Sequence, residues 1–173
     1  IVLKRYIDER IIEIPWIIRN LDTYKSKKIL DAGCTLNFDY LIKKILKNKN
    51  HLIFTNIFPE KYKFYSNETK YINGDISNLP LKNNYFDAIT CLSVLEHIGF
   101  DNSIYDYNQT KKLNLNFKSN KNLYKKAIKE LKRVLKPNKW LYLSFPFGKK
   151  MFFDNYQQFD MNDLKKLIKI FSP

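Results

Sequence analysis

Three apolar segments of this chain each end in a polar residue whose chemistry suits ligand binding. Asp31 lies near the end of "KKILDAGC", Asn56 near the end of "HLIFTNI" and Asp75 at the end of "KYINGD". A carboxylate can accept hydrogen bonds from ammonium and amine groups, and an amide can bond a hydroxyl. The same residues have a structural alternative, because Asp31 and Asp75 could bond turn amides and Asn56 could be an ordinary turn residue.

The hydrophobic pattern predicts the elements that position these residues. Compact apolar runs indicate strands, and stretches with apolar residues three and four apart indicate helices between them. One such helix follows the first strand, with Asn37 as a plausible N-cap. A second spans 123–136, with Asn122 as its cap and Pro137 ending it. The expected strands lie at 27–34, 51–57, 70–75, 85–95 and 139–147.

Strands that alternate with helices imply an α/β fold with a parallel sheet covered on both faces. In an open parallel sheet, ligands bind beyond the carboxyl ends of the strands. We therefore expect Asp31–Asn37, Asn56, Asp75 and Leu92–His97 to converge at one edge of the sheet.

Three further segments complete the chain, which we interpret as one domain over residues 1–173. Residues 1–26 form an N-terminal helical cover, in which Pro15 should limit a regular helix to one side of itself. Residues 99–120 are a polar insert, and loops of this length are usually functional or disordered. Residues 162–171 have the spacing of a final helix.

Composition narrows the function classes. No apolar run is long enough to span a bilayer, so we expect a cytoplasmic protein. The two cysteines, Cys34 and Cys91, lack histidines at metal-ligand spacing, which favours buried thiols and no metal site. The net charge of +14 comes mostly from lysine, and ten lysines and Arg133 lie within 110–139 against a single acid. A solvated lysine face is favoured over a nucleic-acid surface, because arginine, the better phosphate reader, is scarce.

Three motifs, in order and in register from residue 28 to 148, resemble one family. They are "ILDAGC", "GDISNLPLKNNYFDAITCLSVLEHIG" and "LKRVLKPNKWLYLSFPFG". The chain resembles the class I S-adenosylmethionine-dependent methyltransferases, and more closely their small-molecule, methyltransferase type 11-like branch. The resemblance implies a Rossmann-like doubly wound sheet with parallel strands in the order 3-2-1-4-5. Family members usually add two antiparallel strands, which we expect to be missing or truncated here, with no sixth strand.

The resemblance also implies S-adenosylmethionine as the cofactor and assigns residues to it. The turn after the first strand would receive the methionine end, the end of the second strand the ribose, and the end of the third the adenine. The end of the fourth strand would lie beneath the sulfonium. The implied cofactor-binding residues are Asp31, Gly33, Cys34, Thr35, Asn37, Asn56, Ile57, Asp75, Ile76, Leu92 and Ser93.

The first turn departs from the family pattern. The family normally has glycine at the positions of Thr35 and Asn37, and here Gly33 alone remains. Asparagine tolerates a left-handed conformation, but β-branched Thr35 disfavours positive φ. Either the turn has another shape or the cofactor lies further out, and Thr35 could donate its hydroxyl to the cofactor carboxylate.

Methyl transfer from a sulfonium depends mainly on alignment, but an acceptor hydroxyl must also lose its proton. His97 is the one histidine near the predicted cleft, although it could instead cap the following helix. Glu96 is the second catalytic candidate. Acceptor-side candidates are Tyr105, Tyr107 and the Pro146–Gly148 turn, with surface aromatic residues in a loop as the alternative.

The resulting hypothesis is methyl transfer to a small-molecule acceptor, with "EHIG", "SFPFG" and "QQFD" suggesting a sugar hydroxyl in polysaccharide biosynthesis. One alternative is an RNA methyltransferase that uses the lysine-rich face over 110–139. Against it, "LSVLEH" stands where base-modifying amino methyltransferases have an Asn/Asp-Pro-Pro-aromatic motif. The other alternative, motivated by the altered glycine turn, is a non-catalytic cofactor-binding protein.

Overall fold

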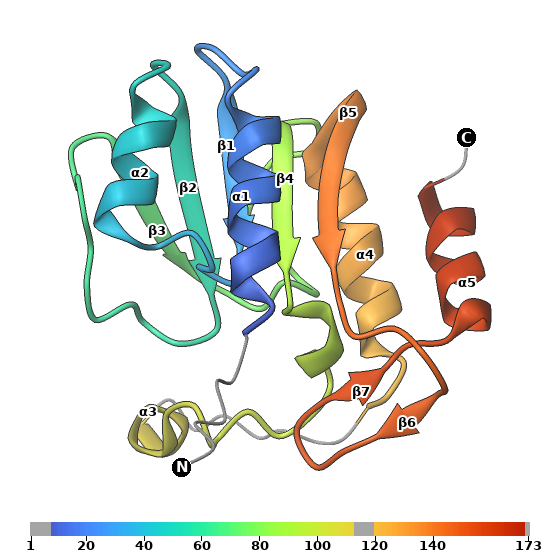
Figure 1. Cartoon of the computed structure of the whole chain (residues 1–173). Coiled ribbons are helices and arrows are strands. Elements are labelled where there is room, and N and C mark those ends of the chain that lie inside the picture. Colours follow the sequence, from blue (N-terminus) through green and yellow to red (C-terminus); the bar gives the residue numbers. More distant parts are fainter. Residues whose placement is uncertain (1–7, 113–119, 172–173) are drawn as a thin grey trace, which may run out of the picture.

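The centre of the molecule is a five-stranded parallel sheet in the order β3-β2-β1-β4-β5 (Figure 1). The computed structural model describes residues 8–112 and 120–171. The strand order, and the parallel pairing of every neighbouring pair, confirm the predicted doubly wound fold. The strands are β1 (Lys28–Ala32), β2 (His51–Asn56), β3 (Thr69–Asn73), β4 (Phe86–Leu92) and β5 (Leu135–Ser144).

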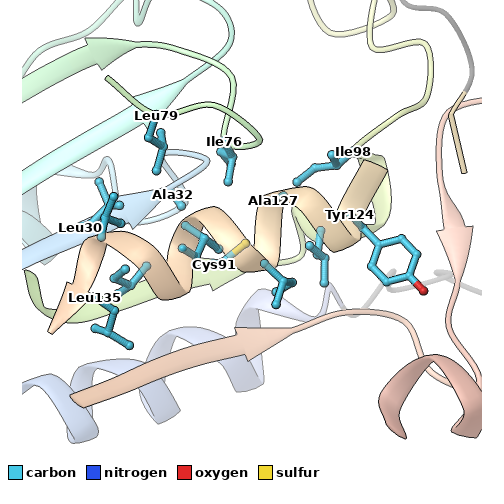
Figure 2. Close-up of a cluster of buried hydrophobic side chains, with 14 of the residues drawn as sticks. Leu30, Ala32, Ile76, Leu79, Cys91, Ile98, Tyr124, Ala127 and Leu135 are labelled. Atoms are coloured by element: carbon cyan, nitrogen blue, oxygen red, sulfur yellow. The ribbon is translucent and has the colours of Figure 1, made fainter. Parts of the chain in front are cut away.

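Helices cover both faces of this sheet, as the buried strands require. Helices α1 (Arg10–Leu21) and α2 (Asp39–Leu46) share one apolar cluster with β1, β2 and β4. Helix α4 (Leu123–Val134) covers the other face, where Figure 2 shows its residues packed against β1 and β4. Helix α5 (Met161–Phe171) lies beside α4 (Figure 1).

Three local expectations need correction. Helix α1 continues through Pro15, because packing of Ile17 and Leu21 outweighs the loss of one backbone hydrogen bond. Asn37 is not the N-cap of α2, since Phe38 occupies that position. Asn122 occupies the N-cap position of α4, but its side chain accepts a hydrogen bond from Lys125 Nζ rather than from a backbone amide.

Helix α4 is also shorter than predicted, and β5 begins directly after it at Leu135. The carbonyls of Arg133 and Val134 accept hydrogen bonds from the Asn84 and Tyr85 amides, at 2.9 and 2.8 Å. These bonds hold the end of the helix against the start of β4, and the chain becomes extended before Pro137.

The two ends of the predicted insert are joined. The Asn120 amide donates to the Gly99 carbonyl at 2.8 Å, so the chain leaves and returns at one point. Gly99 has φ +89°, and a Cβ there would lie 2.1 Å from the Asn120 carbonyl oxygen. Glycine is therefore required at this closure. Between these ends the described part contains helix α3 (Tyr107–Lys112), and residues 113–119 lie outside it.

The C-terminal part contains a feature that the sequence did not predict. Two short antiparallel strands, β6 (Met151–Phe152) and β7 (Gln157–Gln158), form a hairpin separate from the main sheet (Figure 1). The expectation of no strand after the fifth is wrong to this extent, although the main sheet has five strands and α5 is helical as predicted. Strands of two residues are too short for an alternating pattern to reveal.

Within residues 8–112 and 120–171, no helix combines the length and the apolarity needed to cross a membrane.

Candidate functional site

A cavity of about 830 Å³ lies at the carboxyl ends of the strands. Its wall combines the turn after β1, the residues after β2, β3 and β4, and the start of the polar insert. The predicted convergence at this edge is therefore present, although not for every residue. The predicted site residues that line the cavity are Gly33, Thr35, Asn56, Ile57, Asp75, Ile76, Ser93, Glu96 and His97.

The turn after β1 resolves the conflict expected at Thr35. The left-handed conformations fall on Gly33 and Cys34, with φ +107° and +57°, and not on the β-branched residue. A Cβ at Gly33 would lie 2.3 Å from Val94 Cγ2, so glycine is required there for space and for backbone conformation. Thr35 Oγ1 donates to the Leu92 carbonyl at 3.0 Å, which holds the turn against the end of β4.

Asp31 faces the interior of this turn. Its carboxylate accepts from the Leu36 amide and from Thr90 Oγ1, both at 2.7 Å, and its side chain is fully buried. Burial raises the pKa of Asp31 to about 6, although both hydrogen bonds act in the opposite direction. In this geometry Asp31 supports the turn, as the structural alternative described, and does not line the cavity.

Glu60 organises the neighbouring rim, although no sequence pattern indicates this role. Its Oε1 accepts from Asn56 Nδ2 at 2.8 Å, and its Oε2 accepts from Asn37 Nδ2 at 3.1 Å. The Cys34 thiol also hydrogen-bonds Glu60, and burial raises the thiol pKa. Tyr71 donates its hydroxyl to Asn37 Oδ1 at 2.8 Å. One carboxylate thus joins the turn after β1 to the end of β2.

The adjacent part of the rim carries an exposed carboxylate. Asp75 accepts from the Ser77 amide at 2.7 Å and from Ser77 Oγ at 2.8 Å, and its side chain remains open to solvent. Ile76 is buried beside it in the cavity wall. Carboxylate oxygens have further lone pairs, so Asp75 can still accept a hydrogen bond from a ligand amine.

The first turn of α1 closes the cavity above the end of β4. Arg10 Nη1 donates to the Leu92 carbonyl at 3.2 Å and forms an ion pair with Glu13. Glu13, 7 % exposed, accepts from Ser93 Oγ at 2.7 Å. Glu9 and Arg10 line the cavity, and Leu92 contributes its backbone without lining it. Sequence reasoning placed a helical cover here but did not assign these side chains.

Two titratable residues lie next to each other in the short 3-10 helix Leu95–His97. Glu96 is 4 % exposed, and among the described residues none bonds its Oε2. Burial raises the pKa of Glu96 to about 7. His97 Nδ1 lies 2.9 Å from the Asn155 carbonyl, and burial lowers the pKa of the imidazole. His97 does not cap a following α-helix.

Of the residues predicted to contact the acceptor, some line the cavity and others do not. Tyr105 lines the cavity and packs edge-on against His97, with ring centroids 5.4 Å apart. Tyr107 begins α3, and its side chain lies outside the described part of the structure. The Pro146–Gly148 turn does not line the cavity and instead pairs with Phe159.

The described residues contain no group of histidine, cysteine and acidic side chains that could hold a metal ion. Both cysteines are free, Cys91 fully buried and Cys34 half-buried. The lysines of α4 lie mainly on its exposed side, as the helical spacing predicts.

Residues 30–110 match a family model described as a methyltransferase domain. This part of the chain is similar to the methyltransferase domain family. It contains the turn after β1, the ends of β2 and β3, and the Glu96–His97 pair, so the family match covers most of the cavity wall.

Solved structures of two other proteins share the fold. The cyclase SpnF superposes with a TM-score of 0.63 at 16 % identity, over 91 % of this chain and 55 % of its own. The 1,6-didemethyltoxoflavin-N1-methyltransferase of Burkholderia thailandensis, solved with S-adenosylhomocysteine, gives a TM-score of 0.56 at 12 % identity, over 92 % of this chain and 70 % of its own. Identities this low establish the fold alone.

A curated relative, an uncharacterized protein of Methanocaldococcus jannaschii, is 26 % identical over 136 residues, which are 78 % of this chain. The matched region is 48 % of that relative, so the chain spans about half the length of the curated protein it matches.

Proposed function

We propose that the chain binds S-adenosylmethionine and transfers its methyl group to a small-molecule acceptor. The observation that carries this proposal is a cavity of about 830 Å³ at the strand ends, within a segment that matches the methyltransferase domain family. Its volume lies in the range of roughly 300–1,000 Å³ that is typical of small-molecule sites. The Burkholderia protein with the same fold was solved with S-adenosylhomocysteine and a small acceptor together, which supports this interpretation.

The proposed cofactor position follows the rim residues. The adenine amine would donate to Asp75, beside the apolar side chain of Ile76, and a ribose hydroxyl would bond Asn56. The methionine end would lie along the Gly33–Thr35 turn, with Ser93 beneath the sulfonium. Thr35 donates to Leu92 in this structure, so its hydroxyl would have to turn away to reach the cofactor carboxylate.

The reaction needs few protein groups. When bound, S-adenosylmethionine would supply the methyl group: the acceptor oxygen would bond the methyl carbon as the carbon–sulfur bond breaks, and the electron pair of the broken bond would remain on sulfur. The acceptor proton passes to His97, whose lowered pKa leaves it neutral and able to accept at pH 7. Glu96 is a poorer candidate in this conformation, because its unbonded Oε2 is covered by protein.

The proposal also includes the chemical class of the acceptor, a sugar hydroxyl. A sugar hydroxyl suits the wall around His97, where Asn102 and Tyr105 provide polar groups among Ile98 and Phe100. Aromatic side chains and hydrogen-bonding groups together are typical of sites that orient polar ligands.

Two alternatives make different predictions. The exposed lysines of α4 favour an RNA acceptor, and this version requires RNA affinity that falls steeply with salt and methyl incorporation into RNA. The cyclase with the same fold shows that such a domain can carry another chemistry, so binding without methyl transfer is the second alternative.

Titration calorimetry with S-adenosylhomocysteine tests cofactor binding, and two aspartates provide a matched pair. Asp75 and Asp101 are both exposed, and each accepts a hydrogen bond from the amide of the serine two residues later, Ser77 and Ser103. Only Asp75 lines the cavity. Asp75→Ala should weaken binding about tenfold, equivalent to about 1.4 kcal/mol, while Asp101→Ala should leave it unchanged. Absence of heat at millimolar ligand would contradict the proposal.

Methyl transfer itself requires a labelled cofactor and a panel of acceptors. Transfer to saccharides or other small molecules supports the proposal, and transfer to RNA alone supports the first alternative. Calorimetric binding without transfer to any acceptor class supports the second.

A further inference from the structure

The β6–β7 hairpin contacts the candidate catalytic histidine through its turn. Residues 153–156 form this turn, closed by a hydrogen bond of 2.8 Å from the Phe153 amide to the Tyr156 carbonyl. The Asn155 carbonyl points to His97 Nδ1 at 2.9 Å, and the Tyr156 ring lies 5.8 Å from the imidazole. The Asn155 side chain also hydrogen-bonds Tyr105.

A backbone carbonyl can only accept a hydrogen bond, so the bond at Nδ1 requires a proton on that nitrogen. In a neutral imidazole with its proton on Nδ1, Nε2 carries the free lone pair. The Tyr105 hydroxyl lies 3.4 Å from Nε2, a long contact that an incoming hydroxyl can replace.

We propose that the β6–β7 hairpin is a positioning element, whose Asn155 carbonyl fixes His97 in the Nδ1–H tautomer and leaves Nε2 as the proton acceptor for the methyl acceptor. The inference rests on the proposed function for its catalytic meaning, but the tautomer is a property of the protein alone. It also identifies the acceptor as one whose nucleophile carries a removable proton, such as a hydroxyl.

A buried polar network holds the hairpin in this position. Lys150 Nζ donates to Asp163 Oδ2 at 2.6 Å and to Gln157 Oε1 at 2.8 Å. Gln157 is fully buried, and its amide donates to the Lys121 carbonyl at 3.3 Å. Tyr124 of α4 donates its hydroxyl to Asp163 Oδ1 at 2.9 Å. These bonds connect β7 and the residue that precedes β6 to α4 and α5.

The network therefore acts on His97 through the turn of the hairpin, by the Asn155 carbonyl and the Tyr156 ring. The other titratable groups around the imidazole are Glu9 and Arg10 at the start of α1, the neighbouring Glu96, and the phenols Tyr105 and Tyr156. None of these offers a bond at Nδ1 shorter than the 2.9 Å to Asn155. During transfer, the acceptor proton reaches Nε2, and the same carbonyl stabilises the imidazolium that forms.

Nitrogen NMR of histidine-labelled protein tests the tautomer without cofactor or acceptor. The chain has two histidines, and the signals of His51 are identified by their loss in His51→Asn. We expect His97 at pH 7.5 to show a protonated Nδ1 and an unprotonated Nε2. A protonated Nε2 would overturn the proposal. Failure of methyl transfer would not change this result, so the two proposals fail separately.

Three variants test whether the hairpin sets the tautomer. Gln157→Ala removes both bonds of the buried amide and should give a mixture of tautomers, with the His97 pKa rising toward its ordinary value as the ring is exposed. Gln157→Glu keeps the acceptor for Lys150 but loses the donor to the Lys121 carbonyl, so it should restore the native signals only in part. Asn155→Ala retains the carbonyl and should leave the tautomer unchanged, although it removes the bond to Tyr105.

Phe153→Ala is a milder variant in case Gln157→Ala does not fold. Phe153 is 37 % exposed and stacks on Tyr156 at 4.3 Å, so its loss loosens the turn but not the core. We expect a partial shift toward mixed tautomers. Native His97 signals in a folded Gln157→Ala or Phe153→Ala protein, with hairpin amides that exchange faster, would show that the hairpin does not position the histidine.

Discussion

The two walls of the cavity are built in different ways. The wall formed by strand ends depends on backbone conformation, with left-handed residues at Gly33 and Cys34 and an amide of Gly33 that donates to the Thr55 carbonyl at 2.8 Å. The wall around His97 depends on contacts with distant segments, through the backbone carbonyl of Asn155 and the Lys150–Asp163 ion pair. In the first wall, only substitutions at particular residues should disturb the structure. In the second, loss of a few contacts should loosen the whole hairpin at once.

The largest effect should come from breaking the strand-end wall. Gly33→Ala forces a side chain into φ +107° and places Cβ 2.3 Å from Val94, so we expect a loss of about 2–4 kcal/mol of stability and of cofactor binding. Denaturant unfolding and calorimetry measure both. Gly74→Ala is the control, because its nearest contacts lie at 3.4 and 3.8 Å. Equal effects of the two variants would contradict this account.

Disruption of the wall around His97 should leave the wall formed by the strand ends intact. Lys150→Met leaves the carboxylate of Asp163, 7 % exposed, without its closest cation. Loss of one partner of a buried pair costs about 3–5 kcal/mol, and we expect about 2–3 here because the Lys150 side chain is 25 % exposed. Affinity for S-adenosylhomocysteine should stay within twofold of wild type. A tenfold loss of that affinity would show that the walls are coupled.

Glu96 lies where the two walls meet, and its burial should make the stability of the protein depend on pH. Its folded-state pKa of about 7 lies above the ordinary value of 4.5, so the native state holds the proton longer than the unfolded chain and stability falls as pH rises through that interval. Asp31, with its pKa raised to about 6, should also make stability fall as pH rises, but over a lower pH range. Glu96→Gln should gain about 1–3 kcal/mol over wild type at pH 8 and little at pH 4. A gain independent of pH would contradict buried ionisation as the cause.

The smallest effect is expected at Asn56, on the rim of the strand-end wall. Asn56→Ala removes one hydrogen bond to Glu60 and, in the proposed complex, one to a ribose hydroxyl. We expect under about 1 kcal/mol of stability change and a several-fold loss of cofactor affinity by calorimetry. Unchanged affinity would remove Asn56 from the proposed cofactor contacts.

Sequence reasoning predicted the strand-end wall better than the wall around His97. Apolar runs and the helical spacing between them indicate the buried strands, so the convergence of Asn56, Asp75 and His97 could be anticipated. The strand order was implied only by the resemblance to the methyltransferase family. The direction of the Asp31 side chain could not be anticipated, because it depends on Thr90 and on the amide of Leu36 in the folded turn. Glu60 likewise acquires its role only when the turn after β1 lies beside it.

The remaining misses have related physical causes. Proline rules describe an isolated helix, and packing of α1 overrides them at Pro15. Capping preferences at Asn37 and Asn122 compete with other partners, and Asn37 bonds Glu60 instead. The hairpin is held by Lys150, Gln157 and Asp163, which look like surface polar residues in the sequence and become buried or half-buried only in the fold.

The closure of the insert at Gly99 and Asn120 has an evolutionary consequence. Because the segment leaves and re-enters the domain at one hydrogen-bonded point, its length and composition can vary without shifting α4 or the sheet. Doubling such a loop adds only about 0.6 kcal/mol of closure entropy. Under the proposed function, exchange of this one segment would change acceptor preference while the two anchoring residues and the rest of the scaffold stay in place.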